Sequence, residues 1–315
     1  MSLTKLSLKG LINNNASHLV GGDSLFTTGK VWYVDSVTGS NGNVGEDPNL
    51  PLATVAQAYT SARANKGDKI VVMPNHAETV TATSINLNKA GVTVINLGNG
   101  KLDQPTYTFS TAAATITVSA ADNTWIGGYF LGNFLDVASA FTLGAAKGFT
   151  LQGGLFEDST ASLNFLSIVT TGATDNDADD LTVVGNKWYG LNTTPLAVVS
   201  ILAAEIRPTI TDNIVNLAAT SGGEFLTLST KIIKGAVIAR NIHNVVGATG
   251  TTTGIFLTGS GTTSTGVVHD NFVASLDTTT ELLFTAGTGL VYFRNEYTGV
   301  ADKSGYILPA IDSAA

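Results

Sequence analysis

The densest group of metal-binding side chains in the sequence is the acidic stretch Asp175-Asn176-Asp177-Ala178-Asp179-Asp180. Alternate aspartates can place oxygen ligands around Ca²⁺, as they do in an EF-hand loop. That loop needs glycine at its sixth position and glutamate at its twelfth, whereas this chain has Asp180 and Asn186 there. We therefore interpret the stretch as a solvated turn, with cation binding as the alternative.

The histidines give little support for nucleophilic catalysis. The chain has four, His18, His76, His243 and His269. His269 directly precedes Asp270, but no Gly-x-Ser-x-Gly sequence accompanies this pair to supply a nucleophile. The glycine-rich stretches 247–254 and 259–266 lack lysine and a following helix, so they predict loops rather than phosphate-binding turns.

Acidic residues recur at one repeated position but alternate there with basic ones. A polysaccharide lyase needs carboxylates that hold Ca²⁺ and a base, and a glycoside hydrolase needs two or three acids facing one cleft. Asp212 and Asp270 share a position that Arg240 and Arg294 occupy in other repeats. The alternation indicates a solvated ladder of charges. We expect no catalytic residue, no cofactor site and no metal site, and we interpret the chain as not an enzyme.

Large aromatic side chains offer a weaker indication of sugar binding. Such rings stack on sugars when they are exposed, although beside strands they more often lie in the core or in subunit contacts. The candidates are Trp125, Trp188, Tyr189 and Tyr297. A glycan is therefore a candidate partner.

The elements that must position these residues repeat along the chain. One set of strand-like segments ends in asparagine, and these asparagines lie 24 to 30 residues apart. The segments are 181–186, 208–213, 236–241, 266–271 and 290–295, and the runs 125–128 and 151–154 fit the same frame with glycine at the end. A second set precedes it at matching intervals, at 141–143, 165–169, 198–202, 225–228, 255–257 and 282–284.

This pattern predicts a solenoid with two strands in each coil. Coils stacked at about 4.8 Å pair every backbone group with the coil above and below. We expect Gly and Asn at the bends because they tolerate left-handed backbone, and we expect stacked asparagines to share amide hydrogen bonds. The alternative is a β-sandwich, whose turns recur at intervals of about 8 to 12 residues.

The start of the chain differs from the coils. Residues 30–35 and 69–74 are predicted strands, and 52–63 has helical spacing, so this helix is expected to cover the open edge of the first coil. The predicted organisation is an N-terminal arm (1–28), a capping strand-helix-strand unit (29–84), coils (85–300) and a C-terminal tail (301–315).

Composition excludes several classes of protein. Hydrophobic residues make up 43% of the chain, which excludes intrinsic disorder, and the absence of cysteine excludes disulfides and thiolate sites. The net charge of −8 disfavours nucleic acid and anionic membranes as partners. No signal-peptide core and no membrane-spanning apolar run are found, so we expect synthesis in the host cytoplasm without export.

A resemblance lies in residues 30–80. Trp32-Tyr33-Val34-Asp35-Ser36, the Gly39–Gly45 loop, Pro51-Leu52-Ala53-Thr54-Val55 and Gly67–His76 resemble the opening of pectin-lyase-like right-handed parallel β-helix proteins, particularly those of tailed-phage virions. The resemblance implies an all-β fold, a right-handed single-stranded parallel β-helix with an N-terminal capping helix. It implies fold more strongly than function.

The expected function follows from this resemblance together with the missing catalytic set. We expect a phage virion structural protein, a capsid decoration or cement protein that forms a homotrimer on the capsid surface and binds the major capsid protein. The short segments on either side of the coils suit a compact cover better than a long spike. The alternatives are a tail spike or fibre that binds or cleaves host-surface polysaccharide, and a polysaccharide lyase.

Overall fold

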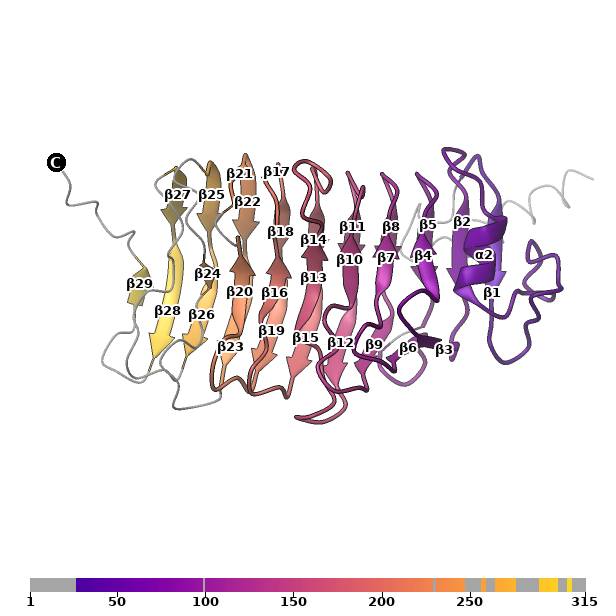
Figure 1. Ribbon diagram of the computed structural model, residues 1–315, viewed down its shortest axis with the longest axis horizontal. Helices are drawn as coiled ribbons and strands as arrows, with labels where there is room; N and C mark the ends of the chain where they lie inside the picture. Colours follow the sequence, from indigo (N-terminus) through magenta and orange to yellow (C-terminus); the bar gives the residue numbers. More distant parts are fainter. Residues whose placement is uncertain are drawn as a thin grey trace, which may run out of the picture.

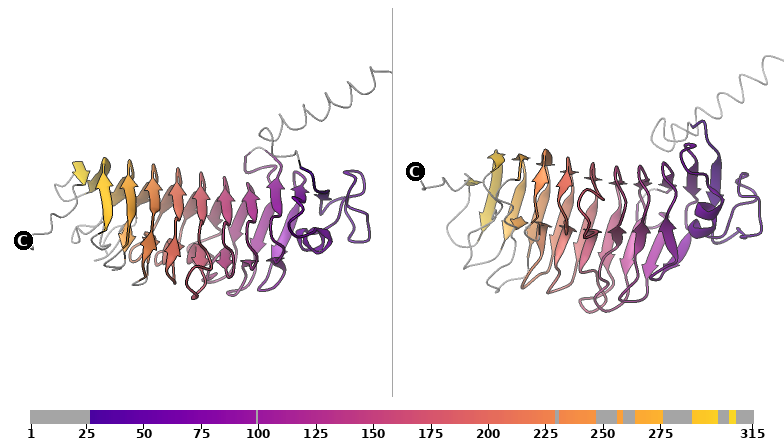
Figure 2. Two further views of the ribbon diagram at one scale, coloured as in Figure 1. Left: turned by 90° about the horizontal axis from the view of Figure 1, so that it is seen from above. Right: turned by 45° about the horizontal axis from the view of Figure 1, so that its top comes forward.

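The computed structural model describes residues 27–98, 100–228, 231–246, 256–258, 264–275, 289–299 and 305–307. Within them the chain winds into a parallel β-solenoid, with its coils stacked along one long axis (Figures 1 and 2). The all-β parallel β-helix predicted from the sequence is confirmed, and the β-sandwich alternative is excluded.

Three long sheets run the length of the solenoid, and we call them sheets A, B and C. Sheet A contains ten strands, β1 (Val31–Val34), β2 (Lys69–Val72), β5 (Thr93–Asn96), β8 (Thr124–Ile126), β11 (Thr150–Gln152), β14 (Thr182–Val184), β18 (Thr209–Thr211), β22 (Ala236–Ala239), β25 (Gly266–His269) and β27 (Leu290–Phe293). Every neighbouring pair in it is parallel.

Sheet B also contains ten strands, and sheet C contains seven. Sheet B contains β3 (Ala77–Val80), β6 (Thr106–Phe109), β9 (Tyr129–Gly132), β12 (Leu155–Asp158), β15 (Lys187–Gly190), β19 (Ile214–Leu217), β23 (Ile242–Val245), β26 (Phe272–Ser275), β28 (Asn295–Gly299) and β29 (Gly305–Ile307). Sheet C contains β4 (Ile85–Leu87), β7 (Ile116–Val118), β10 (Phe141–Leu143), β13 (Ser167–Thr171), β16 (Ala197–Ser200), β20 (Glu224–Thr227) and β24 (Leu257–Thr258).

The coils therefore have three strands, and the expectation of two was wrong. Strands of sheets A and B are joined by turns as short as one residue. Two residues separate β14 from β15, so that 182–190 reads as one continuous β-rich run. The remaining short strands, β17 (Glu205–Ile206) and β21 (Ile233–Lys234), pair with each other between sheets C and A. The predicted segment 282–284 lies outside the described residues.

We call the turns that join sheet A to sheet B the A–B corner, and from β8 onward these turns share one conformation. Their first residue has a φ between 51° and 70°, and the residues are Gly127, Gly153, Gly185, Asp212, Arg240, Asp270 and Arg294. The residue that follows is asparagine in the last five coils. The expectation that asparagine itself takes the left-handed conformation was wrong, because its side chain is needed inside.

Those asparagines form a buried ladder, as predicted. Asn186 donates from its backbone nitrogen and Nδ2 to Oδ1 of Asn213, at 3.0 and 3.1 Å. The same pair of bonds links Asn213 to Asn241, Asn241 to Asn271 and Asn271 to Asn295. An amide both donates and accepts, so each rung can satisfy the next.

Aromatic rings replace the ladder in the earlier coils. Tyr107, Phe130 and Phe156 stack in register, with ring centroids 5.4 and 4.5 Å apart. A Cβ on Gly154 would lie 2.9 Å from the Phe156 ring, so glycine is required where the later coils carry asparagine. The Gly154 nitrogen donates to Oδ1 of Asn186 at 2.8 Å and ends the ladder.

Helix α2 (Val55–Ser61) lies at the N-terminal end of the solenoid (Figure 1). It buries Val55, Ala58 and Tyr59 in the same core as β1 and β2, and its predicted role of covering the open edge of the first coil stays a prediction. Its N-terminal nitrogen at Val55 donates to Glu78 of β3 at 2.9 Å. Because β1 to β3 already belong to sheets A and B, the structure continues without interruption across residue 84. The proposed division into arm, cap, coils and tail stays a prediction.

Asp68 links several segments at the N-terminal end of the solenoid by hydrogen bonds. Its buried carboxylate accepts hydrogen bonds from the backbone nitrogens of Lys30 and Arg63 and from the Arg63 guanidinium, and it lies 3.4 Å from the Trp32 indole nitrogen. Burial would raise its pKa, but these donors outweigh burial and lower it to about 2. Among the described residues, no helix has the length and apolarity needed to cross a membrane.

Candidate functional site

The outer face of sheet A is built from ten parallel strands. Alternate residues of each strand belong to the core, so the others point outward. The strand register aligns these outward residues in two rows. The first row is Val31, Lys69, Thr93, Thr124, Thr150, Thr182, Thr209, Val237, Val267 and Val291, and the second is Tyr33, Val71, Ile95, Ile126, Gln152, Val184, Thr211, Ala239, His269 and Phe293.

This face carries almost no charge. Lys69 and His269 are its only basic residues, it has no acidic one, and five consecutive strands present threonine in the first row. Uncharged Thr and Val side chains dominate the first row over about 40 Å, given a strand spacing of about 4.8 Å. In the second row Val71, Ile95, Thr211 and Ala239 are buried. Such a surface can pack against a second flat sheet without burying an unpaired charge. The sequence contained the signal, since each row lies at a fixed distance before the ladder asparagine.

The segments that join sheet C to sheet A, which we call the C–A corner, hold the acidic stretch. Asp175 accepts from the Ala204 nitrogen at 2.9 Å, and Asp179 accepts from the Ile206 nitrogen at 2.8 Å. Asp180 pairs with the Arg207 guanidinium through both carboxylate oxygens. The stretch is thus a turn that is bonded to the next coil.

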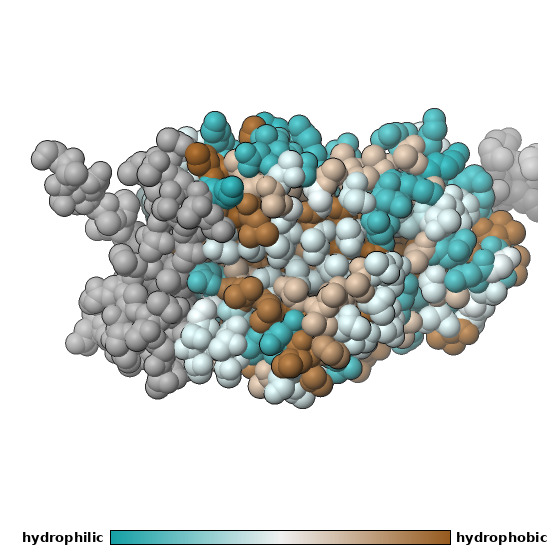
Figure 3. All heavy atoms as spheres, in the orientation of Figure 1, coloured by the Kyte–Doolittle hydropathy of each residue, from teal (hydrophilic) through white to brown (hydrophobic). Residues whose placement is uncertain are grey.

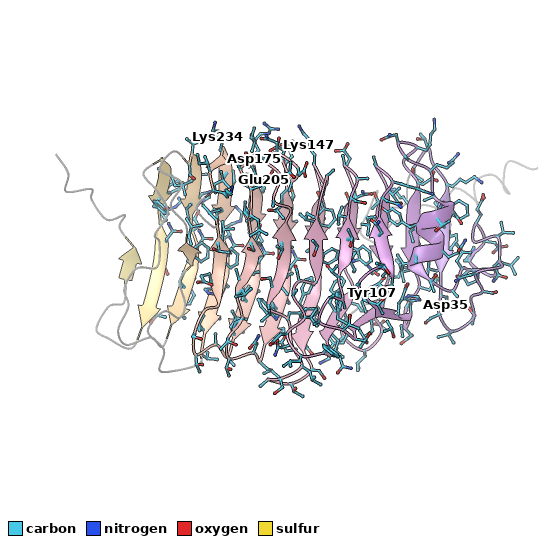
Figure 4. All side chains as sticks on the ribbon, viewed as in Figure 1. Asp35, Tyr107, Lys147, Asp175, Glu205 and Lys234 are labelled. Carbon is cyan, nitrogen blue, oxygen red and sulfur yellow. The ribbon has the colours of Figure 1, made fainter. Side chains whose placement is uncertain are left out.

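Glu205 lies beneath this turn and is 1% exposed. Its Oε2 accepts from the Ala178 nitrogen at 3.1 Å, whereas Oε1 is buried without a hydrogen-bond partner. Burial, together with the charges of Asp179, Asp177 and Asp175, raises its pKa to about 7. Figure 4 shows Glu205 and Asp175 near Lys147 and Lys234 at the upper edge, where hydrophilic atoms gather in Figure 3.

Nothing in this corner has the geometry of a metal centre. Within the part of the chain that the structure describes, no three His, Cys, Asp or Glu side chains are arranged to hold an ion. The aspartates instead accept backbone hydrogen bonds or pair with a cation, as Asp180 does with Arg207. The cation-binding alternative for residues 175–180 therefore gains no support.

The C–A corner also contains a second column of left-handed residues, which sequence reasoning missed. Its members have φ between 56° and 72° and are Asn65, Gly91, Asp122, Gly148, Asp180, Arg207 and Gly235. Backbone hydrogen bonds link successive coils here, as between Gly148 and Asp179 at 2.7 Å. From Asp122 onward each member lies five residues before a left-handed residue of the A–B corner, so the two columns share one spacing along the chain.

The charged residues of the A–B corner form the predicted surface ladder. Arg240 pairs with Asp212 through two bonds of 2.7 Å, and Arg294 pairs with Asp270 at 2.8 Å. The side chains of both arginines are more than half exposed. Opposite charges in adjacent coils offset the cost of placing like charges in a column.

The described histidines have structural environments. His243 is fully buried beside the Gly223 carbonyl, and burial lowers its pKa to about 4, so it is neutral. His76 lies 3.1 Å from Glu78 inside the first coils. His269 contacts Asp270 at 2.6 Å and stacks on Phe293, and none of these contacts involves a serine. His18 lies outside the described residues.

The aromatic candidates divide into buried and exposed ones. Trp125 and Trp188 are core residues, at 0% and 1% exposure. Tyr189 is 42% exposed on the outer face of sheet B. The Tyr297 side chain and the glycine-rich stretch 247–254 are outside the described part of the structure.

Comparisons with known proteins bear on the fold. No family model matches the chain, and no curated protein matches it. Among solved structures it is similar to the pectate lyase Pel9A, with a TM-score of 0.51 and 14% identity over 86% of this chain and 71% of that one. Other similar structures are a rhamnogalacturonan lyase (TM-score 0.42, 13% identity, 78% of this chain and 68% of that one) and a GH136 lacto-N-biosidase from Eubacterium ramulus (TM-score 0.23, 9% identity, 86% and 68%).

The interpretation of the chain as not an enzyme is corrected by these comparisons. The pectate lyase Pel9A has the same parallel β-helix fold, so this fold gives no ground for excluding an enzyme. At 14% identity the likeness to the pectate lyase establishes the parallel β-helix alone and transfers no active-site residue.

Proposed function

We propose that this protein is a structural component of a tailed-phage particle, a decoration protein that associates as a homotrimer and binds the major capsid protein at the capsid surface. The observation that carries the proposal is the uncharged outer face of sheet A. The likeness of residues 30–80 to phage β-helices supports the same assignment.

Trimerisation through this face is favoured by its chemistry. The outward residues of ten strands lie in register, and Lys69 is the only lysine or arginine among them. Closed cyclic assemblies need a surface that each copy can present in the same way, and a prism-shaped subunit with one uncharged side fits a three-fold arrangement. Thr and Val contribute contact area there without a desolvated charge.

The mass in solution tests the association. Light scattering of the full chain should give three times the 32.4 kDa chain mass. Val184→Arg places a charge in the middle of the face and should yield a folded monomer. Thr108→Arg, an outward position on sheet B, should remain trimeric. A wild-type monomer would defeat the assignment.

Capsid binding is tested by cosedimentation with phage heads that lack the decoration protein. The full chain should pellet with the heads. A variant without residues 1–26 should remain folded, because it keeps Thr27, whose hydroxyl donates to the Gly67 carbonyl. We propose that residues 1–26 attach the protein to the capsid, so this variant should stay in the supernatant. Unaltered binding would contradict that role.

A second function, a tail spike or fibre that binds or cleaves host-surface polysaccharide, is favoured by the pectate lyase-like fold. Incubation with host polysaccharide should then produce binding or shortened chains. Ultraviolet absorbance of an unsaturated product would identify lyase chemistry, the third alternative, in the same experiment.

A further inference from the structure

The outer face of sheet B presents an aromatic side chain between two polar ones. Tyr189 on β15 is paired in register with Glu157 on β12 and with Asn216 on β19. The three outward side chains therefore lie in one row across adjacent strands, at a spacing of about 4.8 Å. The inward residues of these strands, such as Trp188, pack in the core beneath the row, so the row lies on a rigid support.

Glu157 is held in place with one oxygen to spare. The Tyr129 hydroxyl donates to Glu157 Oε2 at 2.8 Å, and the Lys101 ammonium pairs with the same oxygen while lying 5.1 Å from the Tyr129 ring centroid. Both contacts use Oε2, so Oε1 can accept from another group. The side chain is 19% exposed, which gives a ligand access to it.

Asn216 offers the opposite hydrogen-bonding character. Its Oδ1 accepts from Nδ2 of Asn244 on the next strand at 2.8 Å. This bond fixes the amide and leaves the Asn216 Nδ2 group as a donor. The exposed ring of Tyr189 is thus flanked by an acceptor on one side and a donor on the other.

We propose that this row is a saccharide-binding site in which one sugar ring stacks on Tyr189 and its hydroxyls bond to Glu157 and Asn216. Stacking on an aromatic face combined with bonds to fixed polar groups is the chemistry that recognises a polyhydroxylated ring. The distance across the three strands, about twice 4.8 Å, accommodates a pyranose ring with hydroxyls on both sides.

A nearby lysine selects for acidic sugars. Lys187 lies two residues before Tyr189 on the same outward side of β15, is exposed, and makes no ion pair with any described residue. The chain as a whole carries a charge of −8, so an uncompensated cation here provides local attraction for a carboxylate. The ligand class is therefore an oligosaccharide that contains uronic acid.

The site gives the second proposed function its location and does not depend on the capsid assignment. It is tested by calorimetric titration of the full chain with oligogalacturonate, and with a cello-oligosaccharide of equal length as the neutral probe. Tyr189→Ala should weaken oligogalacturonate binding about tenfold, the loss expected for one stacking contact. Lys187→Gln should weaken binding of the acidic probe alone, and Lys234→Gln, which removes a lysine from the C–A corner, should change neither.

The outcomes separate the site from the function. Binding that Tyr189→Ala and Lys187→Gln leave intact would overturn the site while glycan binding stands. Binding of neither probe by the wild type would overturn the site and weaken the second function with it. If Tyr189→Ala instead changes the mass in solution and no probe binds, the row is a contact between copies and the proposal is wrong.

Discussion

The two corners that flank sheet A both turn the chain through a left-handed residue, but the buried side chains behind them differ. Both contain a column of left-handed residues, Gly127 to Arg294 in the A–B corner and Asn65 to Gly235 in the C–A corner. Behind the first column lies a ladder of buried asparagines, whereas behind the second lie Asp179 and Glu205. An amide both donates and accepts hydrogen bonds, so the asparagine ladder continues from coil to coil. A carboxylate only accepts, so it cannot donate to a carboxylate in the next coil.

This difference accounts for the unpaired buried acceptor in the C–A corner. Every ladder asparagine is bonded on both sides within the row Asn186 to Asn295, except at its ends. In the C–A corner the Glu205 Oε1 atom is left unpaired, and the pKa of that carboxyl is raised to about 7 by burial and by the neighbouring aspartates.

Replacing one rung with a carboxylate should have the largest effect. Asn241→Asp keeps the shape of the side chain but removes the donor to Oδ1 of Asn271 and to the Ile210 carbonyl. We expect a loss of about 3–5 kcal/mol at neutral pH, the cost of breaking a buried polar network. Urea unfolding measures it. Asn244→Asp on the outer face is the matched control. An equal loss of unfolding free energy there would show that the buried ladder contributes no more to stability than an outer-face amide pair.

Alanine substitutions at Gly153 and Gly154, the two glycines of one A–B turn, should reduce the free energy of unfolding by different amounts. Only at Gly154 does an added Cβ lack space. A Cβ on Gly154 meets the Phe156 and Phe130 rings at 2.9 and 3.1 Å, whereas one on Gly153 meets nothing within 4 Å. Gly154→Ala should cost about 2–3 kcal/mol through overpacking, and Gly153→Ala about 1 kcal/mol through its φ of 67°. The unfolding midpoints of the two variants are compared. Equal midpoints would mean that the Phe156 and Phe130 rings can shift to accommodate the added Cβ.

Glu205→Gln should make the C–A corner insensitive to pH. Because the folded pKa of Glu205, about 7, lies above its ordinary value of 4.5, folding favours the protonated acid. That contribution is complete below pH 4.5 and is lost as the pH rises through 7. The variant should therefore be more stable than the wild type at pH 8, by about 1–3 kcal/mol, and the gain should shrink towards pH 5. A gain that does not depend on pH would contradict this account.

Removing the surface cations should have the smallest effect in both corners. Arg240→Gln and Arg207→Gln each break an exposed pair with an aspartate in the adjacent coil. Solvent and salt screen such pairs, so we expect no measurable change in the unfolding midpoint at physiological salt. A large change for Arg207 alone would show that Asp180 depends on it to hold the acidic turn.

The coil period could be read from the sequence because from β8 onward the A–B turns are only one or two residues long. Asparagines 24 to 30 residues apart mark one residue per coil, and Asn186 and Asn213 are bonded as the spacing suggested. The third strand escaped prediction because β14 and β15 are separated by Gly185 and Asn186 alone. Helix α2 was found from the apolar spacing of residues 52–63, though it is shorter than expected.

The candidate surfaces depended more on the structure. Tyr189 and Trp188 are adjacent and both aromatic, yet one is exposed and the other is core, because successive residues of a strand point to opposite faces. Which of them points outward depends on the register with Phe156 in the previous coil. The same register brings Glu157 beside Tyr189 although they are far apart along the chain.

By itself, the sequence determined the solenoid, since a regular interval of apolar runs and asparagines admits few folds that bury every run. Only the tertiary structure decided how carboxylates, aromatics and glycines from different coils meet. Glu205 and Asp179 become neighbours because β-strand stacking brings every coil within about 4.8 Å of the next. That contact is set by loop lengths and backbone twist, which no local residue pattern encodes.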